Sequence, residues 1–173
     1  AGVPMIVAGP GVPEGAVNRT PVSLLDLHPT VLESAGLPPT PDRPGESLVR
    51  LANEDRPERP VMAEYHAVGS ATGMFMLRLG RFKLIECVGD APLLYDLQND
   101  PDELRNLADD PAHAVALADC SASLRQIVDP ARATAQAFAD QAAMVERLGG
   151  EEAIRGIVPL AFTDPREVMA GGA

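Results

Sequence analysis

Residues 74–108, MFMLRLGRFKLIECVGDAPLLYDLQNDPDELRNLA, decide the fold of this 173-residue chain. Two apolar-rich runs, Met74–Leu79 and Phe82–Cys87, are separated by the dipeptide Gly80-Arg81. Glycine supplies the positive φ that a tight reversal of the backbone needs. The stretch therefore predicts a β-hairpin over residues 74–87.

Two more short apolar runs extend this hairpin into a sheet. Val61–His66 precedes the hairpin and Leu93–Leu97 follows it, and both have the length of a strand. The next segment, residues 99–103, combines a proline with Asn and Asp side chains that hydrogen-bond to nearby backbone. We therefore expect a small antiparallel sheet that ends before this acidic turn.

Beyond Pro111 the apolar spacing changes from period two to a period near 3.6, which predicts helices. A first helix ends before Asp129, and a second begins near Pro130 and ends at Gly149-Gly150. Helices packed on a small antiparallel sheet define an α+β fold. The expected apolar stripes are Ala114, Leu117, Ala118, Leu124 and Ile127 or Val128 in the first helix, and Phe138, Ala142, Val145 and Leu148 in the second.

The first 60 residues predict a strand, a loop and a helix. Met5–Ala8 is an apolar strand candidate. It begins after only four residues, and the sequence has no initiator methionine. Ser23 and Asp26 have the spacing of a capping box, ahead of a helix expected from Leu27 or His28 to Ala35. Because a strand needs neighbours in a sheet, we expect the chain to be part of a longer protein with a larger α/β sheet.

Charge and hydropathy exclude two classes of partner. The formal net charge is −11, and the 14 basic residues are scattered along the chain. A protein that binds nucleic acid needs clustered Lys and Arg to displace counterions, so we expect no nucleic acid partner. No apolar run approaches the roughly 20 residues that cross a bilayer, so we expect no membrane partner.

Several blocks of the sequence resemble, in the same order, the C-terminal part of sulfatases in the alkaline phosphatase superfamily. The later segments around residues 124–130 and 139–150 are similar to the choline sulfatase branch in particular. The similarity spans nearly the whole chain, up to about residue 155. The blocks are Val3–Gly11, Val22–Leu32, Gly45–Leu48, Glu64–His66 and the hairpin with its acidic turn, residues 74–108.

This resemblance implies a hydrolase that cleaves a small sulfate ester through a formylglycine held beside a divalent cation, calcium in the full-length enzyme. The formylglycine arises in a Cys/Ser-x-Pro/Ala-x-Arg motif, which neither Cys87 nor Cys120 matches. In the family, the nucleophile and the metal ligands belong to the N-terminal part. We therefore expect this chain to contain no catalytic residue, to bind no metal and to be inactive alone.

The resemblance also divides the chain into three parts. Residues 1–60 correspond to the end of the α/β catalytic domain with a connector, and residues 61–150 to the C-terminal sulfatase subdomain. Residues 151–173 form a tail that begins with a short helical piece and continues through Pro159 and Pro165, and we expect it to fray.

Glu64 and His66 are the candidate substrate-binding residues. They end the predicted strand beside a loop of small residues, and ligand groups commonly lie at such strand ends. His66 would donate to a substrate oxygen, and Glu64 would face a cationic leaving group. The alternative is that the two side chains only pair with each other at the strand end.

The other polar groups have structural explanations. His28 is expected to cap or pack, and His113 to be solvated, so the histidines form no metal cluster. The acidic residues 96–103 lack the pattern of an EF-hand and predict a turn with local hydrogen bonds. Arg78, Arg81 and Lys83 either bind an anion or lie as alternating charges on an open strand face, which is the commoner case.

The sulfur-containing residues are expected to be structural. Met74 and Met76 are predicted to lie in the core. Cys87 and Cys120 are predicted to be inert, partly buried thiols, with a disulfide between them as the less favoured alternative.

Two other functions stay open at this point. A phosphonate monoester or phosphodiester hydrolase of the same superfamily shares the C-terminal blocks. A module without catalytic activity would instead use the alanine-rich helices as a binding face, and those helices also allow a homo-oligomer.

Overall fold

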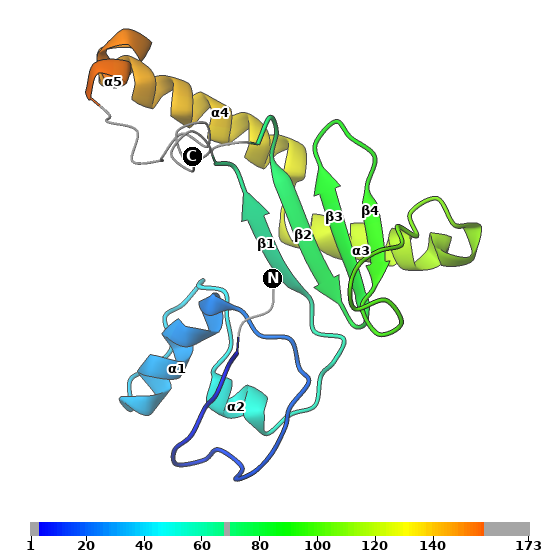
Figure 1. Cartoon of the computed structure of the whole chain (residues 1–173). Helices are drawn as coiled ribbons and strands as arrows, with labels where there is room; N and C mark the ends of the chain where they lie inside the picture. The colour runs from blue at the N-terminus through cyan, green and yellow to red at the C-terminus, as the bar shows by residue number, and fades with distance from the viewer. Residues whose placement is uncertain (1–3, 68–69, 158–173) are drawn as a thin grey trace, which may run out of the picture. The chain divides into compact units, whose positions relative to one another are not determined.

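The computed structural model describes residues 4–67 and 70–157, with side chains described as far as residue 154. The chain forms two compact units, Ala1–Ala131 and Arg132–Ala173. The first unit holds the sheet and most of the helices, coloured from blue to yellow in Figure 1. The second holds most of α4 (Pro130–Arg147) and all of α5 (Glu151–Ile157).

The predicted sheet is confirmed. Its four antiparallel strands run in the order β1-β2-β3-β4 and comprise Val61–Tyr65, Met74–Leu79, Phe82–Cys87 and Leu93–Asp96. Gly80 has φ +56 at the turn between β2 and β3, as the hairpin prediction required. His66 and Leu97, expected to end their strands, lie one residue beyond them.

The outer edge of β4 is covered by the segment that follows the acidic turn. The Leu107 N–H donates to the Leu94 carbonyl over 2.8 Å, and the Leu94 N–H donates to the Asn106 side chain over 2.9 Å. Within the turn, Asp96 accepts hydrogen bonds from the Gln98 N–H and the Asn99 amide. The turn with local side-chain hydrogen bonds is therefore confirmed.

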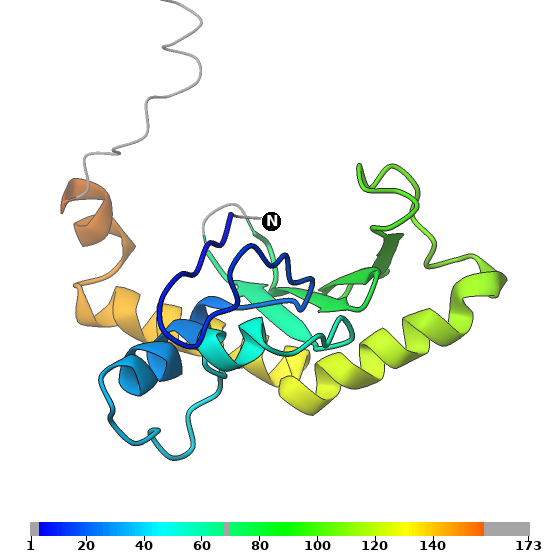
Figure 2. The same cartoon turned by 90° about the horizontal axis from the view of Figure 1, so that it is seen from below.

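One face of the sheet packs against α3 (Ala114–Ile127), which lies beneath the strands in Figure 2. The core on this face is formed by fully buried residues from three strands, namely Phe75, Leu77, Leu84 and Leu94. Met74, predicted to be in the core, points to the other face and is 37% exposed. The prediction was wrong because Met74 and Met76 share their side of β2 with Arg78, whereas α3 covers the alternating set that contains Phe75.

The helix α3 begins after a 3-10 turn, η2 (Pro111–His113), and buries Cys120 and Leu124 against the sheet. The predicted stripe is buried at Leu124 and partly buried at Leu117 and Val128, but Ala114, Ala118 and Ile127 are exposed. The buried side of α3 instead includes Cys120, which the prediction left out. In the second unit, α4 ends before Gly149-Gly150, as predicted, and Phe138 is about half exposed.

The N-terminal region contains two short helices, α1 (Leu27–Ser34) and α2 (Leu48–Ala52), which contact each other. The predicted capping box is present: the Leu25 N–H donates to the Ser23 hydroxyl, and Asp26 accepts from the Ser23 N–H. This box opens a 3-10 turn, η1 (Leu24–Asp26), that leads directly into α1.

The strand predicted over Met5–Ala8 is absent from the structure, where these residues are irregular. A strand is stabilised by hydrogen bonds to a neighbour, and no strand among the described residues pairs with this segment. The short helical piece predicted after residue 150 is present as α5. The fraying predicted for the rest of the tail falls on residues 158–173, outside the described residues.

Candidate functional site

Glu64 and His66 lie at the end of β1 and face the same region. The His66 Nε2 atom is 3.7 Å from a carboxylate oxygen of Glu64. The His66 ring also contacts the ring of Phe75 edge-on, at 5.3 Å between centroids. The Glu64 side chain is 46% exposed and that of His66 is 21% exposed, so the carboxylate is the more accessible of the two groups.

This geometry contains the pairing that the sequence offered as an alternative, and it also leaves the Glu64 carboxylate open to solvent. Glu64 pairs across the sheet with Phe75 of β2, which is fully buried. The backbone pairing with a buried residue fixes the strand end that carries Glu64, and the contact with Phe75 orients the His66 ring. Their role in binding substrate stays a prediction.

The loop of small residues after His66 is tied to the end of β3. The Thr72 hydroxyl donates to the Val88 carbonyl over 2.9 Å, and the Val88 N–H donates to the Gly73 carbonyl over 3.1 Å. These bonds fix the second half of the loop, where it enters β2. Residues 68 and 69, within the same loop, lie outside the described residues.

The strongest electrostatic feature is a buried ion pair between Asp26 and Arg59. Asp26 is fully buried, and its two carboxylate oxygens are 2.7 and 3.0 Å from the two terminal nitrogens of Arg59. The same carboxylate accepts hydrogen bonds from the N–H groups of Ser23 and Glu46. All the hydrogen-bonding positions that a buried carboxylate needs are therefore occupied.

Arg59 and its neighbour Arg56 extend this pair into a network with Glu46. The Arg59 Nε donates to Glu46 over 3.1 Å, and a terminal nitrogen of Arg56 donates to the same carboxylate over 2.6 Å. The hydrogen bond from Arg56 is the main reason that the pKa of Glu46 lies below its usual value of 4.5. Because Arg59 precedes β1 by two residues, the network connects η1 and α2 to the strand that ends at Glu64.

Sequence reasoning identified Asp26 as a helix cap but missed Arg59 as its partner. The two residues are 33 positions apart, and nothing in the spacing connects them. One signal was available. Arg59 lies beside Pro60 in a connector and not on a helix, so it is not one of the regularly spaced charges of a solvent-exposed helix face. That signal does not specify which carboxylate it meets.

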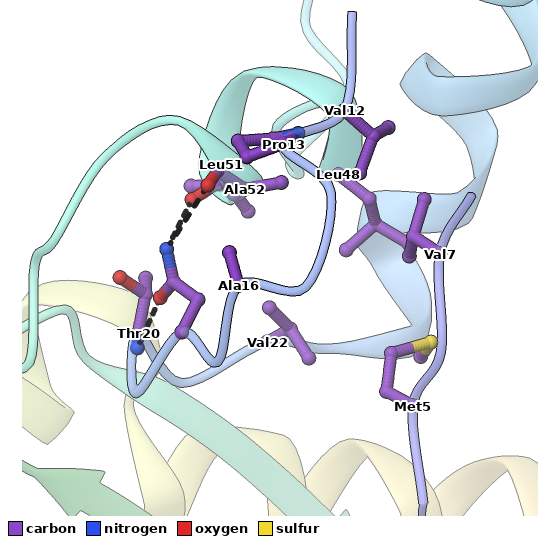
Figure 3. A pocket seen from close by; sticks show the side chains of 11 residues that line it. Met5, Val7, Val12, Pro13, Ala16, Thr20, Val22, Leu48, Leu51 and Ala52 are labelled. Atoms are coloured by element: carbon purple, nitrogen blue, oxygen red, sulfur yellow. Dashed lines mark hydrogen bonds between the residues drawn. The ribbon is translucent and has the colours of Figure 1, made fainter. Parts of the chain in front are cut away.

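A small apolar cavity of about 160 Å³ lies between the N-terminal segment and α2. Figure 3 shows Met5 and Val7 on one side of this cavity and Leu48 and Leu51 on another. Asn18 closes one end, because its amide donates to the carbonyl of Leu51 over 2.9 Å and its oxygen accepts from the Thr20 N–H. The cavity carries no charged side chain, so it has no evident chemistry for a sulfate ester.

The other histidines lie in separate places. The His28 ring is 3.0 Å from the Thr40 hydroxyl, which agrees with a packing role. His113 was predicted to be solvated, but its side chain is 26% exposed, lies 3.3 Å from Asp110 and contacts the ring of Phe82. It is partly covered because η2 begins against the sheet. Among the described residues, no group of three or more His, Cys, Asp or Glu side chains is placed to hold a metal ion.

Two of the three basic residues of the hairpin are paired with carboxylates, and the three are not gathered at one anion site. Lys83 lies 2.5 Å from Glu103, and Arg81 lies 3.4 Å from Asp96 and over the ring of Phe82. Arg78 donates to the Gly80 carbonyl.

Cys87 and Cys120 are both free thiols, and burial raises the pKa of each, that of Cys120 to about 11. None of the helices that the structure describes has the length and apolar character to cross a bilayer.

Residues 1–129 match the family described as N-sulphoglucosamine sulphohydrolase, C-terminal, and the chain belongs to this family. The predicted resemblance to sulfatases is therefore confirmed.

Individual relatives agree with this assignment. The choline-sulfatase of Rhizobium meliloti (strain 1021) is 40% identical over 114 residues, which cover 64% of this chain and 22% of that enzyme. Arylsulfatase K of Danio rerio is 38% identical over 115 residues, covering 61% of this chain and 22% of the relative. The chain thus spans about a fifth of the length of these relatives.

A solved sulfatase structure is similar to this chain in fold as well as in sequence. A 2-O GAG sulfatase superimposes with a TM-score of 0.59 and 29% identity, covering 79% of this chain and 30% of that one. The fold predicted from the hairpin and the helices is therefore the fold of known sulfatases.

Proposed function

We propose that this chain is the C-terminal part of an enzyme that hydrolyses a small sulfate ester. The family match over residues 1–129 is the observation that supports this most directly. The choline-sulfatase and arylsulfatase K relatives are named for sulfate ester hydrolysis, and the chain matches about a fifth of each. In this proposal the reaction takes place in the remaining part of such an enzyme.

The formylglycine and the divalent cation, calcium, belong to that remaining part in this proposal. When bound, the cation would stabilise the negative charge of the sulfate group. The side chains described in this chain do not fit a metal site, and neither cysteine lies in a formylglycine motif. We therefore assign no chemical step to this chain and expect it to be inactive alone.

The contribution that we assign to this chain is substrate binding by Glu64 and His66. Glu64 is a half-exposed carboxylate on a strand whose backbone pairs with a buried residue, and such an accessible negative charge suits a cationic leaving group. His66 lies beside it and can donate from its ring to an ester oxygen. The name of the choline-sulfatase relative indicates a substrate with a quaternary ammonium group, which such a carboxylate would recognise.

A chimaera tests this proposal. The segment of the Rhizobium meliloti choline-sulfatase that matches this chain is replaced by the present sequence, and sulfate release is measured with choline sulfate and with 4-nitrophenyl sulfate. Glu64→Gln is expected to raise KM for choline sulfate by about fivefold, since a quaternary ammonium donates no hydrogen bond and an ion pair at a half-exposed carboxylate contributes about 1 kcal/mol. It is expected to change KM for 4-nitrophenyl sulfate little, because that ester carries no cation.

Two comparisons make the test specific. Glu14→Gln removes an exposed carboxylate from a loop of the same chain and is expected to leave both KM values unchanged. His66→Ala is expected to lower kcat/KM for both esters, because the ring would contact the ester itself. Equal KM values for Glu64→Gln and the parent would refute the role of Glu64, and a folded chimaera that releases no sulfate from either ester would refute the sulfatase proposal.

A further inference from the structure

The connector between α2 and β1, residues 53–60, joins the N-terminal helices to the sheet that carries Glu64 and His66 at one strand end (Figure 1). Within the described residues, neither α1 nor α2 has more than marginal contact with any strand. The direction of the sheet against the N-terminal helices therefore depends on how the connector is held.

Arg59 holds the connector to three separate segments. Its two terminal nitrogens donate to the two oxygens of the buried Asp26 carboxylate over 3.0 and 2.7 Å, and one of these nitrogens also donates to the Pro21 carbonyl over 2.8 Å. Its Nε donates to Glu46, and the Arg59 side chain is only 12% exposed. A planar guanidinium that is bound along two edges has little freedom to rotate.

The preceding residue contacts the sheet instead. The Glu58 carboxylate lies directly against Gly80, at the turn between β2 and β3, in the space that a Cβ would take. Val61, two residues after Arg59, begins the pairing of β1 with β2, which continues through Glu64. Arg59 is therefore bound to the N-terminal region at the point where the connector reaches the sheet.

A small change of direction at Arg59 is amplified at Glu64. The five residues between them span about 16 Å at the rise of a β-strand, so a rotation of about 4° at Arg59 displaces Glu64 by about 1 Å. The paired strands of the sheet move together, so His66 is displaced as well. Displacements of this size are enough to impair the contact between a site residue and its substrate.

In the proposed function, the reacting groups belong to the part of the enzyme outside this chain. The matched family is described as C-terminal, so in such an enzyme the chain passes from the catalytic part through the N-terminal helices before it reaches the sheet. On the basis of the proposed function, we propose that Arg59 is a positioning residue. Its ion pair with Asp26 fixes the direction of the sheet and so places Glu64 and His66 against the substrate.

Residual dipolar couplings of the backbone amides measure this direction by NMR in the isolated chain. In the parent, the couplings of α1 and α2 and those of the four strands are expected to fit one common alignment tensor. In Arg59→Lys they are expected to need two different tensors, because one ammonium group cannot bind both oxygens of Asp26 and also Glu46. The lysine keeps a positive charge beside the buried carboxylate, so the fold is expected to persist.

Arg105→Lys is the matched control, since the Arg105 side chain is 75% exposed and lies 3.5 Å from Asp110. It is expected to retain the single tensor of the parent. A single tensor for Arg59→Lys, or two tensors already in the parent, would overturn the proposal. If Arg59→Lys does not fold, Glu46→Gln takes its place, because it removes one acceptor of the same guanidinium at a side chain that is 36% exposed. An unchanged tensor in that variant likewise counts against the proposal.

Kinetics of the choline-sulfatase chimaera test whether the direction of the sheet matters for the substrate. Arg59→Lys is expected to lower kcat/KM about tenfold for choline sulfate and about threefold for 4-nitrophenyl sulfate, because the first ester uses Glu64 and His66 and the second uses His66 alone. In a chimaera that already carries Glu64→Gln and His66→Ala, Arg59→Lys is expected to change neither value. Arg105→Lys is expected to change neither value in either background.

Equal losses for the two esters, or the same loss in both backgrounds, would overturn the proposal, since a general loss of folded protein produces either result. Separate tensors without any change in kcat/KM would overturn it as well. A folded chimaera that releases no sulfate refutes the proposed function, whereas the couplings still decide whether Arg59 sets the direction of the sheet.

Discussion

At the scale of single residues, the Asp26 carboxylate is the most constrained group in the first unit. Removing a charge from water is costly unless every hydrogen-bonding position is filled, and here two backbone N–H groups and a bidentate arginine fill them. The pair holds together segments that are far apart in the sequence, the turn at residue 23 and the start of β1. Its contribution is therefore to the geometry of the region as well as to its stability.

The first prediction concerns Asp26→Asn. The amide removes one acceptor oxygen and the charge, and it leaves the guanidinium of Arg59, which is 12% exposed, with only the more exposed Glu46 carboxylate as a counter-ion. We expect the free energy of unfolding to fall by about 3 kcal/mol, as measured by urea denaturation followed by circular dichroism.

Asp109→Asn, at an exposed position of the loop before η2, is the matched control and should leave the urea midpoint unchanged. An equal midpoint for Asp26→Asn and the parent would show that the buried pair contributes no net stability.

The second prediction concerns pH. Burial alone would raise the pKa of Asp96, but hydrogen bonds from Asn99 and Gln98 and the charge of Arg81 outweigh it, so the pKa lies below its usual 3.8. Since the folded pKa is below the unfolded one, the stabilisation is present above the unfolded value and is lost as pH falls through the folded value. Stability should therefore decrease as pH is lowered from about 5 to 3.

The variant Asp96→Asn tests this through the slope of its free energy of unfolding against pH, and not through its stability at one pH. With the titrating group removed, the free energy of unfolding should fall less steeply over the same pH range. Asp109→Asn should retain the slope of the parent. Parallel curves for Asp96→Asn and the parent would show that Asp96 does not carry this pH dependence.

At the scale of elements, periodicity predicted which segments form helices and strands but not always the side that they bury. In β2, the adjacent residues Met74 and Phe75 are both apolar and lie on opposite faces, and Arg78, near the end of the strand, is the one residue that marks the Met74 face as the less buried. In α3, alanines widen the apolar stripe, and only contact with the sheet selects Cys120 and Leu124. The segment over Met5–Ala8 has strand composition, but a strand also requires a partner, which composition does not supply.

The third prediction is at this scale and concerns the close approach of the connector to η1. Gly45 has φ +112, and a Cβ at this position would collide with the Leu25 carbonyl oxygen. Gly45→Ala is therefore expected to destabilise the chain by about 2 kcal/mol or more, measured by thermal or urea unfolding.

The control for this substitution is Gly15→Ala. Gly15 also has a positive φ, +65, but no atom lies within 4 Å of its would-be Cβ. Its cost should be limited to the backbone conformation, about 1 kcal/mol. If both variants lost the same stability, the contact with Leu25 would be unimportant and only the backbone angle would matter.

At the scale of the whole molecule, the candidate site was predictable where it depends on local order. The sequence placed Glu64 and His66 at a strand end, and the structure finds Glu64 in β1 and His66 one residue beyond it, because the apolar run and the small-residue loop that follows are local signals. It did not predict the Arg59 link to Asp26, because long-range pairing depends on how the connector folds back. Local signals thus predicted the elements, and tertiary contacts determined how they are joined.

The last prediction concerns the two units. The family match ends at residue 129, and the first compact unit ends at Ala131, so two independent observations coincide within two residues. A domain with its own buried core is expected to unfold cooperatively by itself. A chain truncated after Ala131 should therefore retain cooperative urea unfolding and dispersed amide signals in NMR, because the buried residues of the sheet and α3 are all present. A truncated chain that unfolds without a transition would show that residues 132–173 are required for the core to form.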